Sequence, residues 1–339
     1  MEPASPRHFA LAYLLPIGVA AAAIASPWAA WATVLGFQLV MAGLERVPAW
    51  QSSPPAAPAG AGFRRVLHGH VVLQSGLLAL GVAIAASGAH GVAAVVALGI
   101  GVGGVTGSQG ITFAHELGHS KSRLDRLLGW LLMGSVLYAH FMVEHYRGHH
   151  PRAATHDDPA SARRGESLWR FLPRTLIGSL ASAWSLEARQ LRQFRRGWSR
   201  SALLWATMAQ GGGLLALTLW LGPLALLFWV VQAAYAVFLL EAINYIEHYG
   251  LQRDTAGGRR EPFGVMHAWN ADQRITNRFI INLQRHSDHH MHAWKPYETL
   301  EALPGPQLPT GYAGCLFLAS VPPLWFRVMH PRLAALQPA

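Results

Sequence analysis

Charged residues and cysteine are both scarce in this sequence. Of its 339 residues, 13% are charged and 52% are hydrophobic, whereas about 25% of the residues in a soluble domain are charged. The single cysteine, Cys315, excludes a disulfide framework, a cysteine-ligated iron–sulfur cluster and an internal rubredoxin-type iron site. These shortages exclude an ordinary soluble domain and indicate an integral membrane protein.

Acidic residues are the scarcer charged type. The sequence has 17 Asp and Glu against 27 Lys and Arg, which gives a net charge of +10. In a membrane protein an excess of basic residues favours contact with anionic lipid headgroups. We therefore expect membrane lipid, and no nucleic acid, as the partner of these residues.

Six mostly apolar stretches are long enough to cross about 30 Å of hydrocarbon, which takes about 20 helical residues. The turns Ser26-Pro27, Ser87-Gly88 and Gly222-Pro223 are too short to form anything but helical hairpins. A shorter apolar run, 127–143, predicts a re-entrant or interfacial helix. The sequence thus predicts an all-α integral membrane protein, one membrane-embedded domain over 1–339, with spans near 8–26, 28–46, 66–87, 90–113, 202–221 and 223–245.

The basic residues predict the orientation of these spans. If the three short turns face outward, all 27 Lys and Arg fall on the opposite side of the membrane, which the positive-inside rule makes cytosolic. Both termini and the segments 114–200 and 246–339 would then be cytosolic. Arg7 followed by Leu11–Ile24 also fits a signal peptide. We prefer a retained helix because no other basic residue marks the start of such a peptide.

Three segments outside the spans differ in character. Gln51–Gly62 is a Pro/Ala/Gly linker that carries no evident chemistry. The segment 157–200 mixes apolar residues with arginines, which predicts amphipathic helices on the membrane surface. Tyr312–Phe326 is too short and too rich in proline to cross, so we expect 250–339 to cap the site from the cytosol.

Histidine clusters indicate where the chemistry lies. HELGHS, EHYRGHH and LQRHSDHH hold eight histidines, and NYIEHYG holds a ninth. Imidazole is a preferred ligand of iron, zinc, copper and nickel, and a buried histidine without a metal needs partners for both ring nitrogens. The clusters therefore predict a polynuclear metal site. The candidates are His115, His119, His145, His149, His150, His248, His286, His289 and His290.

Their spacing favours two metals. His115 and His119 are four residues apart, which places them on one face of a helix. His145 and His149 repeat that spacing, and in an α-helix His150 would be turned about 100° from His149. Nine nitrogens suit two metals with four or five ligands each.

Other metal chemistries fit the pattern less well. HELGH is also a metalloprotease motif with Glu116 as the base, but a catalytic zinc takes three protein ligands. A di-iron carboxylate bundle needs two Glu-x-x-His motifs, and the metal region has one, Glu116–His119. A transporter would place ionisable residues within the spans, where few occur. Haem is possible for paired histidines, yet the adjacent His149-His150 favours a dinuclear site.

Carboxylates flank the candidate ligands. We expect them to accept the free ring N–H and so to fix each imidazole, with pairing to a nearby arginine as the alternative for each. The other nine histidines are predicted to be structural or exposed, with His140 and His292 of most interest among them. The flanking carboxylates are Glu116, Glu144, Glu247, Asp158 and Asp288.

These motifs closely resemble those of the AlkB-type integral-membrane alkane monooxygenases, within the fatty acid desaturase and hydroxylase superfamily. The resemblance runs from about Ile111 to the C-terminal LPTGYAGC and PPLWFRVMHPR segments. The three clusters are typical of the superfamily, whereas NYIEHYGL and LQRHSDHH are narrower and favour hydrocarbon hydroxylases. The resemblance implies that the nine candidate histidines bind two non-haem irons.

The resemblance also implies a reaction and its partners. One oxygen of O2 would enter the terminal C–H bond of a medium-chain alkane, with electrons from a rubredoxin or ferredoxin-type donor and its reductase, in a bacterial inner membrane. Hydroxylation of an alkyl-aromatic side chain and desaturation of a fatty acyl chain are the alternatives. We expect the substrate to pass from the bilayer between spans, along Trp31, Phe37, Met41 and Leu44 unless these face lipid. The donor would dock on the basic cytosolic face.

Overall fold

The computed structural model describes residues 2–256 and 259–336, and most of these are helical. Among them, the only strands are the two-residue pair β1 (Thr255–Ala256) and β2 (Arg259–Arg260). Six helices are long and apolar enough to cross a membrane, which confirms the predicted fold class. They are Pro6–Ala25 (α1, η1 and α2), Pro27–Leu44 (α3), Ala61–Ala86 (α4), Val92–His119 (α5, η3 and α6), Ala202–Leu221 (α11) and Pro223–His248 (α12).

Two spans run further than their apolar stretches predict. The fourth continues to His119 rather than ending near 113, and the sixth continues to His248 rather than ending near 245. The added residues are mostly buried, so contacts with the segments outside the spans hold them in helical form. Three candidate ligands therefore lie on direct extensions of membrane helices.

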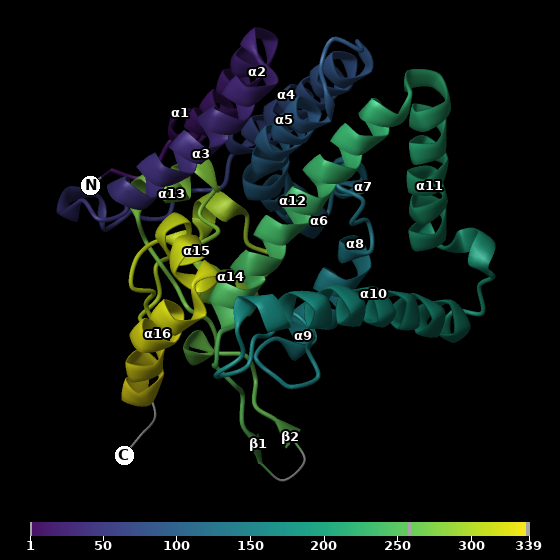
Figure 1. Ribbon diagram of the computed structural model, residues 1–339. Coiled ribbons are helices and arrows are strands. Elements are labelled where there is room, and N and C mark those ends of the chain that lie inside the picture. The colour runs from purple at the N-terminus through teal and green to yellow at the C-terminus, as the bar shows by residue number, and fades with distance from the viewer. Residues whose placement is uncertain (1, 257–258, 337–339) are drawn as a thin grey trace.

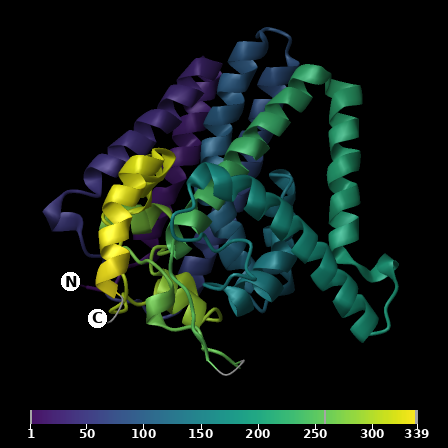
Figure 2. The ribbon, with the colours of Figure 1, turned by 60° about the horizontal axis from the view of Figure 1, so that its bottom comes forward.

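Several short helices and the long helix α10 lie outside the spans and gather at one end of them (Figures 1 and 2). In Figure 1, α10 runs across the ends of α11 and α12, and the β1–β2 hairpin projects from the same end. The helices are α7 (Arg123–Ser135), α8 (Phe141–Glu144), α9 (His150–Arg152), α10 (Leu168–Gln193), α13 (Arg274–Phe279), α14 (His286–Met291), α15 (Tyr312–Ser320) and α16 (Pro322–Leu336). The short turns are the π-helical η3 (Thr106–Gly110) and η4 (His145–His149) and the 3-10 helices η1 (Ala10–Tyr13), η2 (Pro48–Trp50), η5 (Trp198–Arg200), η6 (Val265–His267) and η7 (Tyr297–Thr299).

The run 127–143, predicted as one helix, is divided between α7 and α8. Leu137, at the turn between them, has a φ of 58°. The segment 157–200 contains one long helix, α10, and the short turn η5, with residues 157–167 outside any helix. The buried residues of α10 include Phe171, Thr175 and Ala183. Their spacing of four and eight residues places them on one face, as the amphipathic pattern predicts.

Glycines let α5 pack between α3 and α12 with almost no side chain between the backbones. A Cβ atom on Gly101 would lie 2.7 Å from the carbonyl carbon of Ala30 in α3, and one on Gly103 would lie 2.7 Å from the carbonyl oxygen of Gln232 in α12. Such close approach is how helices associate in lipid, where burial of apolar surface gives little driving force. The contact fixes the helix that continues into His115 and His119.

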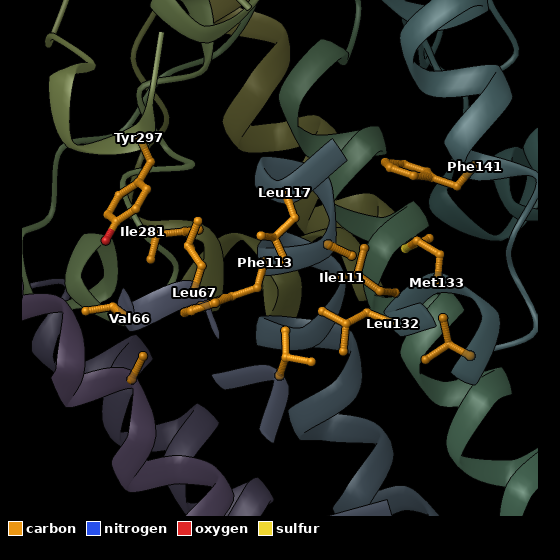
Figure 3. Close-up of a cluster of buried hydrophobic side chains, with 14 of the residues drawn as sticks. Val66, Leu67, Ile111, Phe113, Leu117, Leu132, Met133, Phe141, Ile281 and Tyr297 are labelled. Carbon is orange, nitrogen blue, oxygen red and sulfur yellow. The ribbon is translucent and has the colours of Figure 1, made fainter. Parts of the chain in front are cut away.

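A cluster of buried apolar side chains surrounds α6 (Figure 3). Phe113 and Leu117 project from α6, and both are fully buried. Leu132 packs against them from α7, Leu67 from α4, and Tyr297 from the C-terminal region. Because this packing involves three separate parts of the chain, α6 presents its histidines from a fixed position.

Candidate metal centre

The first part of the site lies on α6. His115 and His119 are on one face of this helix, as predicted from their spacing, and their Nε2 atoms are 3.1 Å apart. The side chain of His115 is buried, and that of His119 is partly exposed. The two rings therefore lie next to each other, and the His115 ring also lies 6.3 Å from the ring of Phe141, a member of the apolar cluster.

A π-helical turn places the second cluster. In η4 the backbone N–H of His150 donates to the carbonyl of His145, so residues five apart lie over one another. The Nε2 atoms of His145 and His150 are consequently 3.0 Å apart. His149 is directed to a different set of histidines. The sequence predicted an α-helical pairing of His145 with His149, and the structure replaces it with the pairing of residues five apart.

The third cluster and the ninth histidine complete the arrangement. On α14, His286 lies with its Nε2 3.2 Å from the Nε2 of His248 at the end of α12. The Nε2 of His289 lies 3.0 Å from that of His115. Thus α14 contributes to both sides of the site.

All nine candidate histidines are brought together, in two groups. Within each group the ring nitrogens lie within 4.8 Å of one another, a spacing at which they could hold a metal ion. The five-histidine group is His115, His119, His145, His150 and His289. The four-histidine group is His149, His248, His286 and His290, all buried.

The donor set fits a cation. Burial lowers the pKa of His145, His150, His286 and His290 well below the usual range, and neighbouring histidines lower it further. Burial lowers the pKa of His289 to about 3. The rings are therefore neutral at pH 7 and keep a nitrogen lone pair for a metal. Both ring nitrogens of His290 are buried without a hydrogen-bond partner in the protein, a cost that metal binding through one of them would reduce.

Two of the five flanking carboxylates contact candidate ligands. Asp158 Oδ2 lies 2.8 Å from His149 Nδ1, and Glu247 Oε1 lies 3.2 Å from His286 Nδ1. Glu247 also accepts a 2.7 Å hydrogen bond from the Tyr312 hydroxyl. A carboxylate on the far ring nitrogen directs the other nitrogen toward the centre of the group.

The other three carboxylates make different contacts. Glu144 accepts from Arg152 at 2.6 Å, and Glu116 accepts from the backbone N–H of Tyr297 at 3.1 Å. Asp288 accepts from Lys295 at 3.0 Å and pairs with His292 at 2.6 Å. These contacts tie α6, α9 and α14 to their surroundings. His292 pairs with Asp288 and belongs to neither histidine group. His156 is exposed.

Sequence reasoning missed several supporting groups. The backbone carbonyl of His267 lies 3.3 Å from His248 Nδ1, and no motif marks it. The linker Gln51–Gly62 is also part of the support, because Arg285, beside His286, donates to the carbonyl of Pro54 at 2.7 Å. Backbone groups of this kind carry no residue-type signal and are found only once the fold is known.

An apolar channel ends at the histidines. Phe37 and Met41 of α3, which were predicted to line it, do so together with residues of the fourth and sixth spans and of α15. Trp31 and Leu44 are not part of the wall that the described residues form. His115 and His145 of the five-histidine group and His286 of the four-histidine group also line it. The channel thus connects the membrane spans with both groups.

Comparison with known proteins places the chain in a family. The family model for fatty acid desaturase matches residues 89–315, which include all nine histidines. The chain therefore belongs to the fatty acid desaturase family.

Several similar proteins have names that specify a reaction. The chain is 43% identical to alkane 1-monooxygenase 2 of Pseudomonas aeruginosa over 243 residues, 70% of the chain and 64% of the relative. It is 42% identical to alkane 1-monooxygenase of Acinetobacter baylyi, over 70% of the chain and 59% of the relative. Identity to the xylene/toluene monooxygenase hydroxylase component of Pseudomonas putida is 29%, over 68% of the chain and 62% of the relative. In each case the match covers less than two thirds of the relative's length.

Proposed function

We propose that this protein hydroxylates the terminal carbon of a medium-chain alkane. The observation that supports the proposal is the junction of an apolar channel with two groups of converging histidines. An alkane offers no hydrogen-bonding group, so only an apolar wall of suitable shape can select it. The similarity to alkane 1-monooxygenases, at 42–43% identity, favours the same reaction.

We propose further that the two groups hold two non-haem iron ions, one in each. Imidazole nitrogen suits iron, and the two groups of converging rings supply nine such nitrogens. When bound, the metals would supply the activation of O2. In the complete reaction, alkane, O2, two electrons and two protons give a primary alcohol and water.

The chain's own residues would position the substrate. Phe37 and Met41 line the channel on one side and Leu239 on another, so the alkane would lie between α3 and α12. Its terminal carbon would stop at His115 and His145, where the channel ends. Because the wall is apolar, water is kept from the reacting carbon.

The site is proposed to lie on the cytosolic side of a bacterial inner membrane. That orientation places all 27 Lys and Arg with the histidines and agrees with the positive-inside rule. Electrons would come from a separate rubredoxin or ferredoxin-type protein and its reductase, since one cysteine, buried Cys315, cannot build a cysteine-ligated redox centre.

The test is product analysis on purified protein in lipid, with a reconstituted donor system. We expect n-alkanes to give 1-alkanols, and metal analysis to give about two irons per chain. Alkyl aromatics and fatty acids are the matched alternative substrates. Oxidation of the aromatic side chains alone, or formation of double bonds, would replace the alkane proposal. Zinc as the only metal, at one per chain, would overturn the di-iron site.

A further inference from the structure

A second, smaller pocket also lies against the metal centre. Its wall includes His145 of the five-histidine group and His149 of the four-histidine group. His140, Glu144 and Glu241 supply its polar side chains. The pocket therefore reaches both groups from one place.

The pocket and the channel share a wall. Phe141, His145 and Asn244 line both spaces, but what lies beyond them differs. The channel is lined largely by aliphatic and aromatic residues, whereas the pocket adds two carboxylates and the imidazoles of His140 and His149. Glu144, Glu241 and His140 line the pocket and not the channel, so these polar side chains reach the metal centre only from the pocket.

Two polar atoms in this pocket have no partner in the protein. Glu144 Oε2 and His140 Nε2 are both buried and make no hydrogen bond, and their residues are 4% and 9% exposed. Leaving a buried polar atom unpaired costs about 1–3 kcal/mol. Glu241 differs, because Tyr138 and Thr175 each donate to it at 2.7 Å. The unmet hydrogen-bonding capacity is therefore concentrated at His140 and Glu144.

The size of the pocket suits one small ligand. Its volume is about 10 Å³, close to the minimum of about 10–15 Å³ that a buried water needs, together with two to four polar partners. Burial lowers the pKa of His140 to about 4, so its ring is neutral at pH 7 and has one N–H and one lone pair. Such a ring can either donate to a water or accept from it.

Glu144 connects the pocket to the surface. Its other oxygen, Oε1, accepts from Arg152 at 2.6 Å, and Arg152 also donates to the Ser182 hydroxyl at 2.8 Å. The side chain of Arg152 is 22% exposed. A polar path therefore runs from solvent at Arg152, past Glu144, to the space beside His145 and His149.

We propose that the pocket binds one water molecule, held by His140 and Glu144, which delivers solvent protons to the metal centre and gives product water a way out. The inference rests on the proposed function, in which each turnover takes up two protons and forms one water. Both protons end on the oxygen atom that is reduced to that water, and the electrons come from the donor protein. Neither protons nor water crosses an apolar channel readily, so a separate polar path keeps the alkane side dry.

Water binding can be tested without turnover. High-resolution cryo-electron microscopy of the metal-free and the zinc-loaded protein should show one density within about 3 Å of both His140 Nε2 and Glu144 Oε2. His140→Leu removes the ring nitrogens and should abolish the density, whereas His140→Gln keeps a polar group and should retain it. A pocket without density in the unsubstituted protein, in both preparations, would overturn the proposal even if the protein hydroxylates alkanes.

Proton delivery can be tested separately, by measuring how much alcohol and how much peroxide each donor electron yields. His140→Leu should lower alcohol formed per donor electron by about tenfold, with the lost electrons appearing as peroxide and a larger solvent isotope effect. His140→Gln should restore most of the coupling. His90→Leu, at the outer turn, is the matched control, and metal content and gel-filtration volume check that each variant folds. If His140→Leu leaves both coupling and isotope effect unchanged, the pocket does not carry protons.

Discussion

The two histidine groups differ in how their rings are held. In the four-histidine group, three of the four rings have an oxygen beside Nδ1: Asp158 for His149, the His267 carbonyl for His248 and Glu247 for His286. The contacts of His149 and His248 are hydrogen bonds, whereas Glu247 lies near His286 Nδ1 without a hydrogen bond. In the five-histidine group, no Nδ1 atom forms a hydrogen bond with an oxygen of the described residues, and His119 and His150 are partly exposed. The first group is therefore aligned by the protein, and the second depends on the metal to align it.

This difference predicts unequal metal affinity. Outer hydrogen bonds fix the tautomer and the orientation of a ligand ring and make it more basic. A metal in the four-histidine group should accordingly be held more tightly and exchange more slowly. The five-histidine group is free to adjust its rings, which suits the side of the site where His115 and His145 face the channel.

Removing a ring from the well-supported group should have the largest effect. His248→Ala should lower hydroxylation by at least about a hundredfold and cost the protein one metal, because His248 is fully buried among the other ligands of its group. His156→Ala, an exposed histidine outside both groups, is the control and should keep both properties. Full activity in His248→Ala would remove the ninth histidine from the ligand set.

Removing the support of one ring should have an intermediate effect. Asp158→Asn should weaken metal binding in the four-histidine group by about 10–100-fold, measured by competition with a chelator, because an amide holds His149 less firmly. The adjacent Asp157→Asn is a close control, since its side chain is 67% exposed. Equal affinities in the two variants would mean that the Asp158–His149 contact does not set metal affinity.

Acid should destabilise the metal-free protein. Burial lowers the pKa of His289 to about 3 in the folded state, against about 6.5 in the unfolded chain. The contribution of this neutral ring to the free energy of unfolding is therefore complete above pH 6.5. As the pH falls from 6.5 toward 3, the free energy of unfolding decreases by up to about 1.4 kcal/mol per pH unit. The midpoint of thermal unfolding should fall over this range, less steeply in His289→Asn. Identical slopes would mean that His289 is not buried as a neutral ring.

Changing the channel wall should alter selectivity more than rate. Phe37→Ala should extend the preferred alkane length by a few carbons, because a removed side chain leaves space along the channel. Trp31→Ala on the same helix is the control, since Trp31 is 38% exposed and outside the wall. Product distributions from mixed alkanes measure this. A shift with Trp31→Ala alone would place the substrate on the other face of α3.

The smallest expected effect concerns the electron donor. Reversing the exposed pair Arg195 and Arg196 to glutamate should raise the KM for an acidic donor severalfold, with a smaller effect at high salt, because screening acts over about 8–10 Å at 0.1–0.15 M. Turnover with a chemical reductant should be unchanged. A donor KM that responds to neither salt nor reversal would assign these arginines to the membrane.

Much of this architecture could be predicted because apolar length and histidine spacing are local signals. The six spans and the shared face of His115 and His119 follow directly from them. The π turn could not be predicted, because the residues between His145 and His150 show no pattern that distinguishes it from an α-helix. The ends of the spans were also missed, since His119 and His248 remain helical only through contacts with distant segments.

The carboxylate contacts around the histidines were also predictable only in part. Five carboxylates near histidines were marked as supports, but proximity in sequence does not decide direction, and Glu144 and Asp288 turn to Arg152 and Lys295 instead. Glu45 was not marked at all. It is buried at the end of α3 and accepts from Thr276 and from the backbone of Gly314, so it ties the second span to the segments that follow the last one. Such long-range pairs have no sequence signal.

The π turn of η4 makes the two-group arrangement sensitive to the length of the chain at one point. With regular α-helical geometry, His150 would be turned about 140° from His145, and the pair that now closes the five-histidine group would separate. One residue more or fewer between Glu144 and His149 would therefore redistribute ligands between the two groups without changing any ligand. In this stretch a single insertion or deletion is expected to be more damaging than most substitutions, whereas exposed surface loops generally tolerate changes of length.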